Sequence, residues 1–139
     1  MQIEELKLKP GEELSFDKKL VFIVDDDKSV RRALKFLLET YGFAVETYSC
    51  AEKFFSTVPN SALGCLIMDI HMPGLNGWQA LQILIKTRAN RPVIIITADR
   101  NSDFKEQALK AGTAGFLQKP FNDNELVDLI NLTFEGRIR

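Results

Sequence analysis

Cysteine and histidine are scarce in this sequence, which has two cysteines and one histidine among 139 residues. Cys50 and Cys65 lie among apolar neighbours and show no CxxC spacing. We therefore expect both to be buried free thiols in a reducing compartment. Zinc in proteins is bound mostly by cysteine and histidine. Because His71 is the only histidine and neither cysteine is near the acidic clusters, the sequence argues against a zinc site.

An excess of charge is also missing, as is any long apolar run. The formal net charge is −1, which provides no long-range field for nucleic acid, so we expect no direct nucleic-acid binding by this chain. No apolar run reaches the length of a membrane span, and the charge-rich N-terminus does not fit a signal peptide. These absences predict a cytoplasmic protein with no membrane partner.

Residues 1–19 differ in composition from the rest of the chain. They are charge-rich and interrupted by Pro10-Gly11, and they predict a loosely packed N-terminal arm. The whole chain is 45% hydrophobic and long enough for one core without a disulfide or metal. We expect one domain over residues 20–136 and a short tail at 137–139.

Short apolar segments recur along this domain, and each ends at polar or turn residues. Segments of this length and composition are typical of strands that are covered on both faces. The first ends at Asp25-Asp26-Asp27, and the third ends at Asp69 before Pro73 and Gly74. The expected strands are 20–24, 43–48, 66–69, 93–96 and 115–117.

Helical periodicity fills the intervals between these strands. The first helix has one apolar stripe and a glycine stop, and it comprises Val30, Ala33, Leu34, Leu37, Leu38 and Tyr41, followed by Gly42. Ser49 and Glu52 form a capping box for a second helix that ends near Thr57. Three more helices are expected, at about 78–85, at 104–111 before Gly112, and from the Asn122/Glu125 cap to Phe134 before Gly136.

Alternating strands and helices imply parallel strands joined by right-handed crossovers. The expected fold class is therefore α/β, a doubly wound five-stranded parallel sheet with helices on both faces. Ligands of such folds bind beyond the carboxyl ends of the strands. The polar residues at those ends are Asp25, Asp26, Asp69, Thr97 and Lys119.

Carboxylates that meet at one sheet edge repel one another, and a hard divalent cation relieves that repulsion. Mg²⁺ accepts oxygen ligands and keeps several waters, so one or two carboxylates with a backbone carbonyl form a sufficient site. We expect His71 to contribute its backbone carbonyl rather than its imidazole. Lys119 has two compatible interpretations, as a structural counter-ion and as a cation that holds a phosphoryl oxygen. An aspartate such as Asp69 can itself carry a phosphoryl group as an acyl phosphate.

Five motifs in order resemble the receiver domain of bacterial two-component response regulators. They are Asp25-Asp26, Asp69-x-x-Met72-Pro73, Gly77, Thr97-Ala98 and Phe116-x-x-Lys119-Pro120. The resemblance runs from about Leu20 to Phe134. It implies a flavodoxin-like sheet with strand order 2-1-3-4-5 and a cis bond between Lys119 and Pro120.

The resemblance also implies the role of each site residue. Asp69 would accept a phosphoryl group from a histidine kinase or phosphotransfer protein. Mg²⁺ would be bound by Asp26, Asp69 and the His71 carbonyl, with Asp25 acting through water. Thr97 and Lys119 would contact the phosphoryl group.

The output of such a domain is a change of surface. Phe116 would change its burial on activation, and the face of the fourth helix, fifth strand and fifth helix would switch. Asp99 adds an acid near the site and leaves the lifetime of the phosphorylated state open. The cognate kinase, a homodimer formed on phosphorylation and a following effector domain also stay open. Phe43-Ala44-Val45 together with Ser49 to Phe55 resembles the corresponding stretch of receivers that precede LuxR-type DNA-binding domains.

Three other classes of protein compete with a signalling module. A phosphatase of the haloacid dehalogenase type needs an acid two residues after Asp69, where His71 stands. An NTPase needs a GxxxxGK[ST] loop, which the sequence lacks. An interaction domain with an inactive site fits poorly with a complete set of acid, threonine and lysine. We therefore expect no enzyme activity beyond the chain's own phosphorylation and dephosphorylation.

Overall fold

The structure, a computed structural model, describes residues 19–71, 79, 82–83, 91–98 and 102–136. The N-terminal arm, the tail and Asp99 lie outside these residues, apart from Lys19 of the arm. The helix expected at about 78–85 is described only at Gln79, Gln82 and Ile83, each of which is helical. The described residues therefore bear on the domain and not on the two ends of the chain.

Five parallel strands form one sheet in the order β2-β1-β3-β4-β5, which confirms the expected fold and strand order. Each strand occupies one of the predicted apolar segments, with small shifts at the ends. The strands are β1 (Leu20–Val24), β2 (Ala44–Tyr48), β3 (Cys65–Asp69), β4 (Val93–Thr97) and β5 (Gly115–Gln118). The interior strands β3 and β4 are buried at every residue, because both of their faces are covered.

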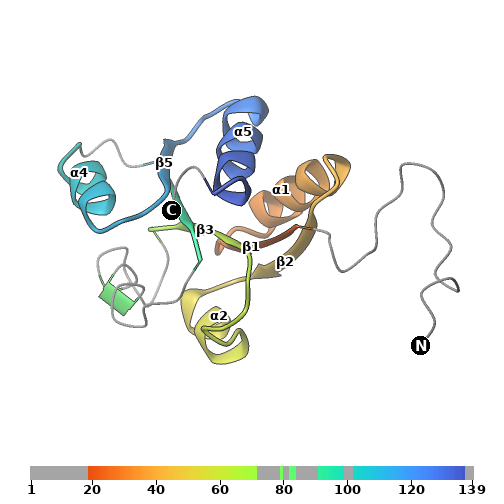
Figure 1. The fold of residues 1–139 in the computed structure, drawn as a ribbon, viewed down its shortest axis with the longest axis horizontal. Coiled ribbons are helices and arrows are strands. Elements are labelled where there is room, and N and C mark those ends of the chain that lie inside the picture. The colour runs from red at the N-terminus through yellow and green to blue at the C-terminus, as the bar shows by residue number, and fades with distance from the viewer. Residues whose placement is uncertain (1–18, 72–78, 80–81, 84–90, 99–101, 137–139) are drawn as a thin grey trace, which may run out of the picture.

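Helices cover both faces of the sheet (Figure 1). On one face, α1 (Lys28–Thr40) and α5 (Asp123–Phe134) pack on a core layer that includes Ile23 and Ile67. On the other face, α2 (Ala51–Thr57) packs on a layer that includes Phe22 and Met68. A fourth helix, α4 (Ser102–Lys110), contacts β5. Successive strand residues alternate between the two layers, as the pleat of a sheet requires.

Two helices have a side-chain cap at their N-terminus. The Asp27 carboxylate accepts hydrogen bonds from the backbone N–H groups of Ser29 and Val30, at 2.8 and 3.4 Å, and so begins α1 directly after the acidic run. Asn122 and Glu125 form the predicted capping box of α5. The chain leaves α1 through Gly42, whose φ of +92° is the left-handed conformation expected of the glycine stop.

The capping box predicted for α2 is wrong. Cys50, not Ser49, is the N-cap of this helix, and it makes no side-chain capping hydrogen bond. The Ser49 hydroxyl instead accepts a hydrogen bond from Lys53 at 3.3 Å. The start of α2 is set by packing, because Ala51 is buried in the core layer beside Phe54.

Two predictions of burial were too broad. Ala33 and Tyr41 belong to the apolar stripe of α1 in the sequence, but both are exposed, because α1 contacts the sheet through a narrower strip centred on Leu34 and Leu38. Both cysteines are free thiols as expected, although only Cys65 is buried and Cys50 is partly exposed. Burial raises the pKa of Cys65 to about 12, which keeps its thiol protonated at neutral pH.

Candidate functional site

The carboxyl end of β1 delivers two acids to the edge of the sheet. Asp25 follows the strand directly and is fully buried, whereas Asp26 is exposed. The backbone N–H of Asp25 donates to the Tyr48 carbonyl of β2 at 3.1 Å. The Asp25 carboxylate accepts a hydrogen bond from the Asp27 N–H at 2.9 Å. Asp25 is thus held in a fixed orientation, while Asp26 faces solvent.

The carboxyl end of β3 places Asp69 beside this pair. Asp69 is only 6% exposed. Its Oδ1 accepts a hydrogen bond from the His71 N–H at 2.8 Å, so the loop after β3 begins by orienting the carboxylate. In the sheet, Asp69 is paired with Ile96 of β4, and β3 also pairs with β1. This central position explains why an acid at the end of β3 meets side chains from the neighbouring strands.

Lys119 lies between the acids of the two strands. Its Nζ is 2.9 Å from Asp69 Oδ2 and 3.2 Å from Asp25 Oδ2. Lys119 follows β5, and the bond to Pro120 is cis as predicted. Its backbone N–H donates to the Thr97 carbonyl at 2.7 Å, so the end of β4 fixes the position of the Lys119 backbone. One ammonium group therefore bridges two carboxylates that come from different strands.

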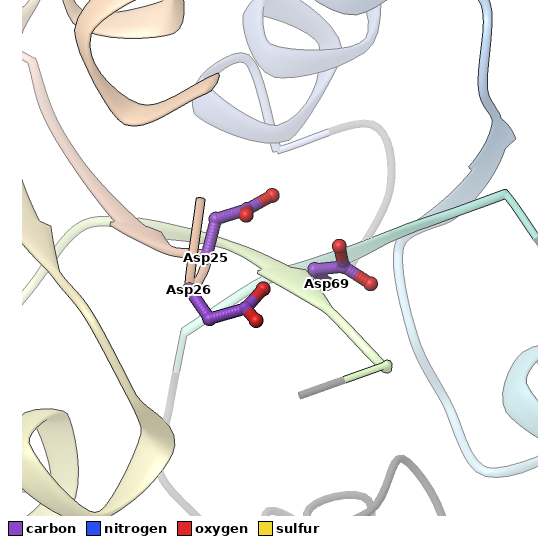
Figure 2. A group of neighbouring side chains, drawn as sticks. All are labelled: Asp25, Asp26 and Asp69. Carbon is purple, nitrogen blue, oxygen red and sulfur yellow. The ribbon is translucent and has the colours of Figure 1, made fainter. Parts of the chain in front are cut away.

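The three carboxylates form one cluster, which Figure 2 shows at the ends of β1 and β3. Each of Asp25, Asp26 and Asp69 offers one oxygen, and these oxygens all lie within 4.8 Å of one another. Three hard oxygen donors at this spacing suit Mg²⁺ and do not suit zinc. The residues present therefore fit a magnesium ion, with Asp26 and Asp69 as its accessible carboxylates.

The pKa values of Asp25 and Lys119 are both raised, but for different reasons. Burial raises the pKa of Asp25, and the nearby charge of Asp69 raises it further, although the Asp27 N–H and Lys119 oppose this shift. Burial alone would lower the pKa of Lys119. The hydrogen bond to Asp69 and the charges of Asp25 and Asp69 outweigh burial, and the pKa of Lys119 is raised. The lysine is therefore a firmly charged ammonium at neutral pH.

Thr97 and Phe116 lie on the side of the sheet that carries the core layer of Phe22 and Met68. Val93 and Ile95 of β4 belong to the core layer under α2, so strand alternation places Thr97 on that face. Thr97 is fully buried, and Phe116 is partly buried against the same layer. The structure thus brings Asp25, Asp26, Asp69 and Lys119 together. It places Thr97 one backbone hydrogen bond from Lys119, with Phe116 farther back in β5.

One residue that touches the site does not stand out in the sequence. Arg31, on the first turns of α1, donates from Nη1 to the backbone carbonyl of Asp25 at 2.7 Å. Its sequence context is that of an ordinary charged position of an amphipathic helix. The only sequence feature that points to this contact is the spacing of six residues from Asp25. Helical side chains point toward the helix N-terminus, so a long side chain at Arg31 can reach the residues just before the helix.

Comparison with protein families gives a match over most of the chain. Residues 21–131 match the response regulator receiver domain. Among curated relatives, the transcriptional regulatory protein FixJ of Bradyrhizobium diazoefficiens is 34% identical over 110 residues, which are 79% of this chain and 54% of FixJ. The C4-dicarboxylate transport transcriptional regulatory protein DctR of Rhodobacter capsulatus is 39% identical over 111 residues, 78% of this chain and 56% of DctR. The chain spans about half the length of these relatives.

Solved structures agree with this match. The response regulator StyR superposes with a TM-score of 0.79 at 38% identity and covers 86% of this chain, which spans 61% of StyR. The isolated FixJ-N has a TM-score of 0.78 at 34% identity, with 88% of this chain and 98% of FixJ-N covered. Among the described residues, no helix is both long and apolar enough to cross a bilayer. The chain belongs to the response regulator receiver domains, signalling modules of phosphorelays that work through aspartate phosphorylation.

Proposed function

We propose that Asp69 is the phosphorylated aspartate of this receiver domain and that a histidine kinase or phosphotransfer protein supplies the phosphoryl group. The observation that carries the proposal is the position of Lys119, whose Nζ bridges Asp69 and Asp25 at 2.9 and 3.2 Å. This places a fixed positive charge beside the carboxylate that would receive a highly anionic group. Asp69 also retains limited solvent access at 6% exposure, whereas Asp25 has none.

The proposed step is an in-line transfer. An oxygen of the Asp69 carboxylate forms a bond to phosphorus as the bond from phosphorus to the donor imidazole nitrogen breaks. The leaving imidazole keeps the electron pair of that bond, and the product on Asp69 is an acyl phosphate. Hydrolysis by water returns the carboxylate and releases inorganic phosphate. Such transfers depend mainly on positioning and on stabilising charge, so no additional acid or base is needed.

Mg²⁺ would be held by the carboxylates of Asp26 and Asp69 and by the backbone carbonyl of His71. Asp25 would act through a bound water, because it is fully buried whereas Asp26 is exposed and Asp69 keeps some exposure. The ion supplies charge neutralisation for the phosphoryl oxygens when it is bound. The support for this assignment is the oxygen-only donor set and its spacing.

Lys119 and Thr97 would hold the transferred group. The Lys119 ammonium exchanges part of its contact with the Asp69 carboxylate for a contact with a phosphoryl oxygen. The hydroxyl of the buried Thr97, at the end of β4, would donate one hydrogen bond. Removal of a donor of this kind typically costs about 10²- to 10³-fold in rate.

The same contacts would drive a conformational switch on the α4–β5–α5 face. Charge-assisted hydrogen bonds contribute roughly 1.5 to 3 kcal/mol each, and a shift from 1% to 99% active needs about 5.5 kcal/mol. Two new bonds reach that figure only near their upper limit. Phosphorylation would therefore bias the switch, and a partner that binds the active face, such as a second copy of the chain, would complete it. Phe116 would report the change through its burial.

The chain would act as a signalling module whose catalysis is confined to its own phosphorylation and dephosphorylation. FixJ and DctR are named as transcriptional regulatory proteins, and this chain spans about half of each. A transcriptional output through a further domain is thus the output we propose for the whole protein. The free thiols of Cys50 and Cys65 agree with a cytoplasmic compartment.

Incubation with acetyl phosphate and Mg²⁺ tests this function, with intact-protein mass spectrometry as the readout. The wild-type chain should gain the mass of one phosphoryl group, and Asp69→Asn should gain none. Asp128→Asn, at an exposed position of α5, is the matched control and should be phosphorylated like the wild type. A wild-type chain that takes up no phosphoryl group from acetyl phosphate or from phosphorylated kinases would instead support an interaction domain.

A further inference from the structure

Arg31 connects helix α1 to the acidic end of β1. Its Nη1 donates to the Asp25 backbone carbonyl at 2.7 Å, and the residue is partly buried. The next residue, Arg32, is exposed and lines the same shallow hollow as Arg31. The two adjacent arginines of α1 carry the same charge, and the structure shows a hydrogen bond to the acidic loop for Arg31.

The loop from Asp25 to Asp27 is held at several points. The Asp25 N–H donates to Tyr48 at 3.1 Å, and the Asp27 N–H donates to the Asp25 carboxylate at 2.9 Å. Asp27 then caps α1 with its own side chain. The Arg31 guanidinium adds a bond to the remaining backbone acceptor of Asp25, so that its N–H, its C=O and its carboxylate are all engaged. Asp26 projects from the middle of this braced loop.

We propose that Arg31 is a positioning residue for the magnesium site, because it fixes the peptide that links Asp25 to Asp26. The Asp25 carbonyl belongs to that peptide, so a hydrogen bond to it restricts the rotation that would swing the Asp26 carboxylate away from Asp69. A ligand that is already oriented loses less conformational freedom when a cation binds. This inference rests on the proposed function, since it concerns the same acids.

Electrostatics and positioning make opposite predictions for the loss of Arg31. A cation close to three carboxylates repels Mg²⁺, so removal of the charge alone should tighten Mg²⁺ binding. Removal of the brace should weaken it. Supporting contacts around metal ligands are typically worth roughly 10- to 100-fold in metal affinity, and we expect about 10-fold here because Arg31 acts on backbone rather than on the carboxylate itself. The sign of the change therefore identifies the role.

The experiment measures Mg²⁺ dissociation constants by isothermal titration calorimetry for the wild type, Arg31→Met, Arg31→Lys and Arg32→Met. Arg31→Met should bind Mg²⁺ about 10-fold more weakly, and Arg31→Lys, which keeps the charge but loses the forked donor, should lie between it and the wild type. Arg32→Met removes the same charge without a contact to the loop and should bind as the wild type or slightly more tightly. Hydrogen exchange of the Asp27 amide without Mg²⁺ should be faster in Arg31→Met, which reports loosening of the loop without any metal.

Phosphorylation by acetyl phosphate separates this inference from the proposed function. In Arg31→Met the Mg²⁺ concentration for half-maximal rate should rise about 10-fold, while the rate at saturating Mg²⁺ stays close to that of the wild type. Equal or tighter Mg²⁺ binding by a folded Arg31→Met would overturn the positioning role. If Arg31→Met fails to fold, an Arg31→Lys variant with wild-type affinity and wild-type Asp27 exchange would overturn it as well. A wild-type chain that is not phosphorylated would instead overturn the proposed function.

Discussion

Two cationic side chains, one buried and one partly buried, lie at opposite ends of the strands of the sheet, and they are stabilised in different ways. Lys119 follows the carboxyl end of β5 and contacts two carboxylates. Arg91 precedes the amino end of β4, is 7% exposed, and has no carboxylate partner among the described residues. It donates to the Pro59 carbonyl at 2.6 Å and lies 5.6 and 5.3 Å from the Phe22 and Phe54 ring centroids.

The contrast separates a site from a structural contact. Burial lowers the pKa of Arg91, whereas the carboxylates around Lys119 overcome burial and raise its pKa. The Nε of Arg91 has no hydrogen-bond partner in the described part of the chain, so this side chain is only partly satisfied. Burial of a charge thus does not identify function by itself. The informative feature of Lys119 is an excess of negative charge around it that a second cation can share.

The largest expected difference between the two cations is in the rate of phosphorylation when each is replaced by methionine. Lys119→Met should lower the rate of Asp69 phosphorylation by acetyl phosphate about 10²- to 10³-fold, because the transition state loses its fixed ammonium. Arg91→Met, the matched control at the opposite edge, should react at the wild-type rate. Phosphoprotein formed over time, measured by mass spectrometry at saturating Mg²⁺, gives both rates. Slow phosphorylation of Arg91→Met, or phosphorylation of Lys119→Met at the wild-type rate, would contradict the assignment of a functional role to Lys119 and a structural role to Arg91.

Truncation of Arg91 should affect stability instead of chemistry. Arg91→Ala removes the guanidinium from the Phe22 and Phe54 rings and its hydrogen bond to the Pro59 carbonyl, so we expect a loss of about 2 to 4 kcal/mol in the free energy of unfolding. Urea denaturation followed by circular dichroism measures this change. Lys105→Ala, an exposed lysine of α4, is the control and should lie within about 0.5 kcal/mol of the wild type. A loss as small as that of the control would mean that Arg91 contributes little.

Added Mg²⁺ should stabilise the folded chain only by binding at the carboxylate cluster of Asp25, Asp26 and Asp69. At ten times its dissociation constant, an ion that binds the folded chain alone stabilises it by about 1.4 kcal/mol. We expect this gain in the wild type and in Arg91→Met, and its loss in Asp26→Asn, as measured by thermal unfolding with and without EDTA. A gain that persists in Asp26→Asn would place the ion elsewhere.

The smallest effect should be the pH dependence that Asp25 causes. Its pKa is raised above 3.8 in the folded chain, so its contribution to stability is full below pH 3.8 and is lost as the pH rises through the folded pKa. Asp25→Asn should therefore be more stable than the wild type at pH 7, and the difference should close toward pH 3. Because the Asp27 N–H and Lys119 offset part of the cost of burial, we expect a modest difference. Melting temperatures across this pH range, without Mg²⁺, measure it, and a less stable Asp25→Asn at pH 7 would show that its hydrogen bonds outweigh its burial.

The strands and most of the site could be predicted from the sequence because their causes are local. The apolar runs before Asp25 and Asp69 predict buried strands and also show where those strands end. In a parallel sheet the carboxyl ends of the strands lie on the same side, so the two acids are expected to lie close together. Arg91 could not be predicted in the same way. It lies in a polar stretch before Pro92, and its burial depends on two phenylalanines from distant segments. The start of α2 was missed for a related reason, since the packing of Ala51 overrides the Ser49 capping pattern.

The hydrogen bond from the Lys119 N–H to the Thr97 carbonyl has a consequence for how a signal travels. The Lys119 ammonium contacts Asp25 and Asp69, whereas Phe116 of the preceding strand packs against the core layer that includes Phe22 and Met68. This amide therefore joins the residue that carries the ammonium directly to the end of β4 through the main chain. Under the proposed function, a phosphoryl group on Asp69 that attracts Lys119 would act on β4 through this main-chain bond.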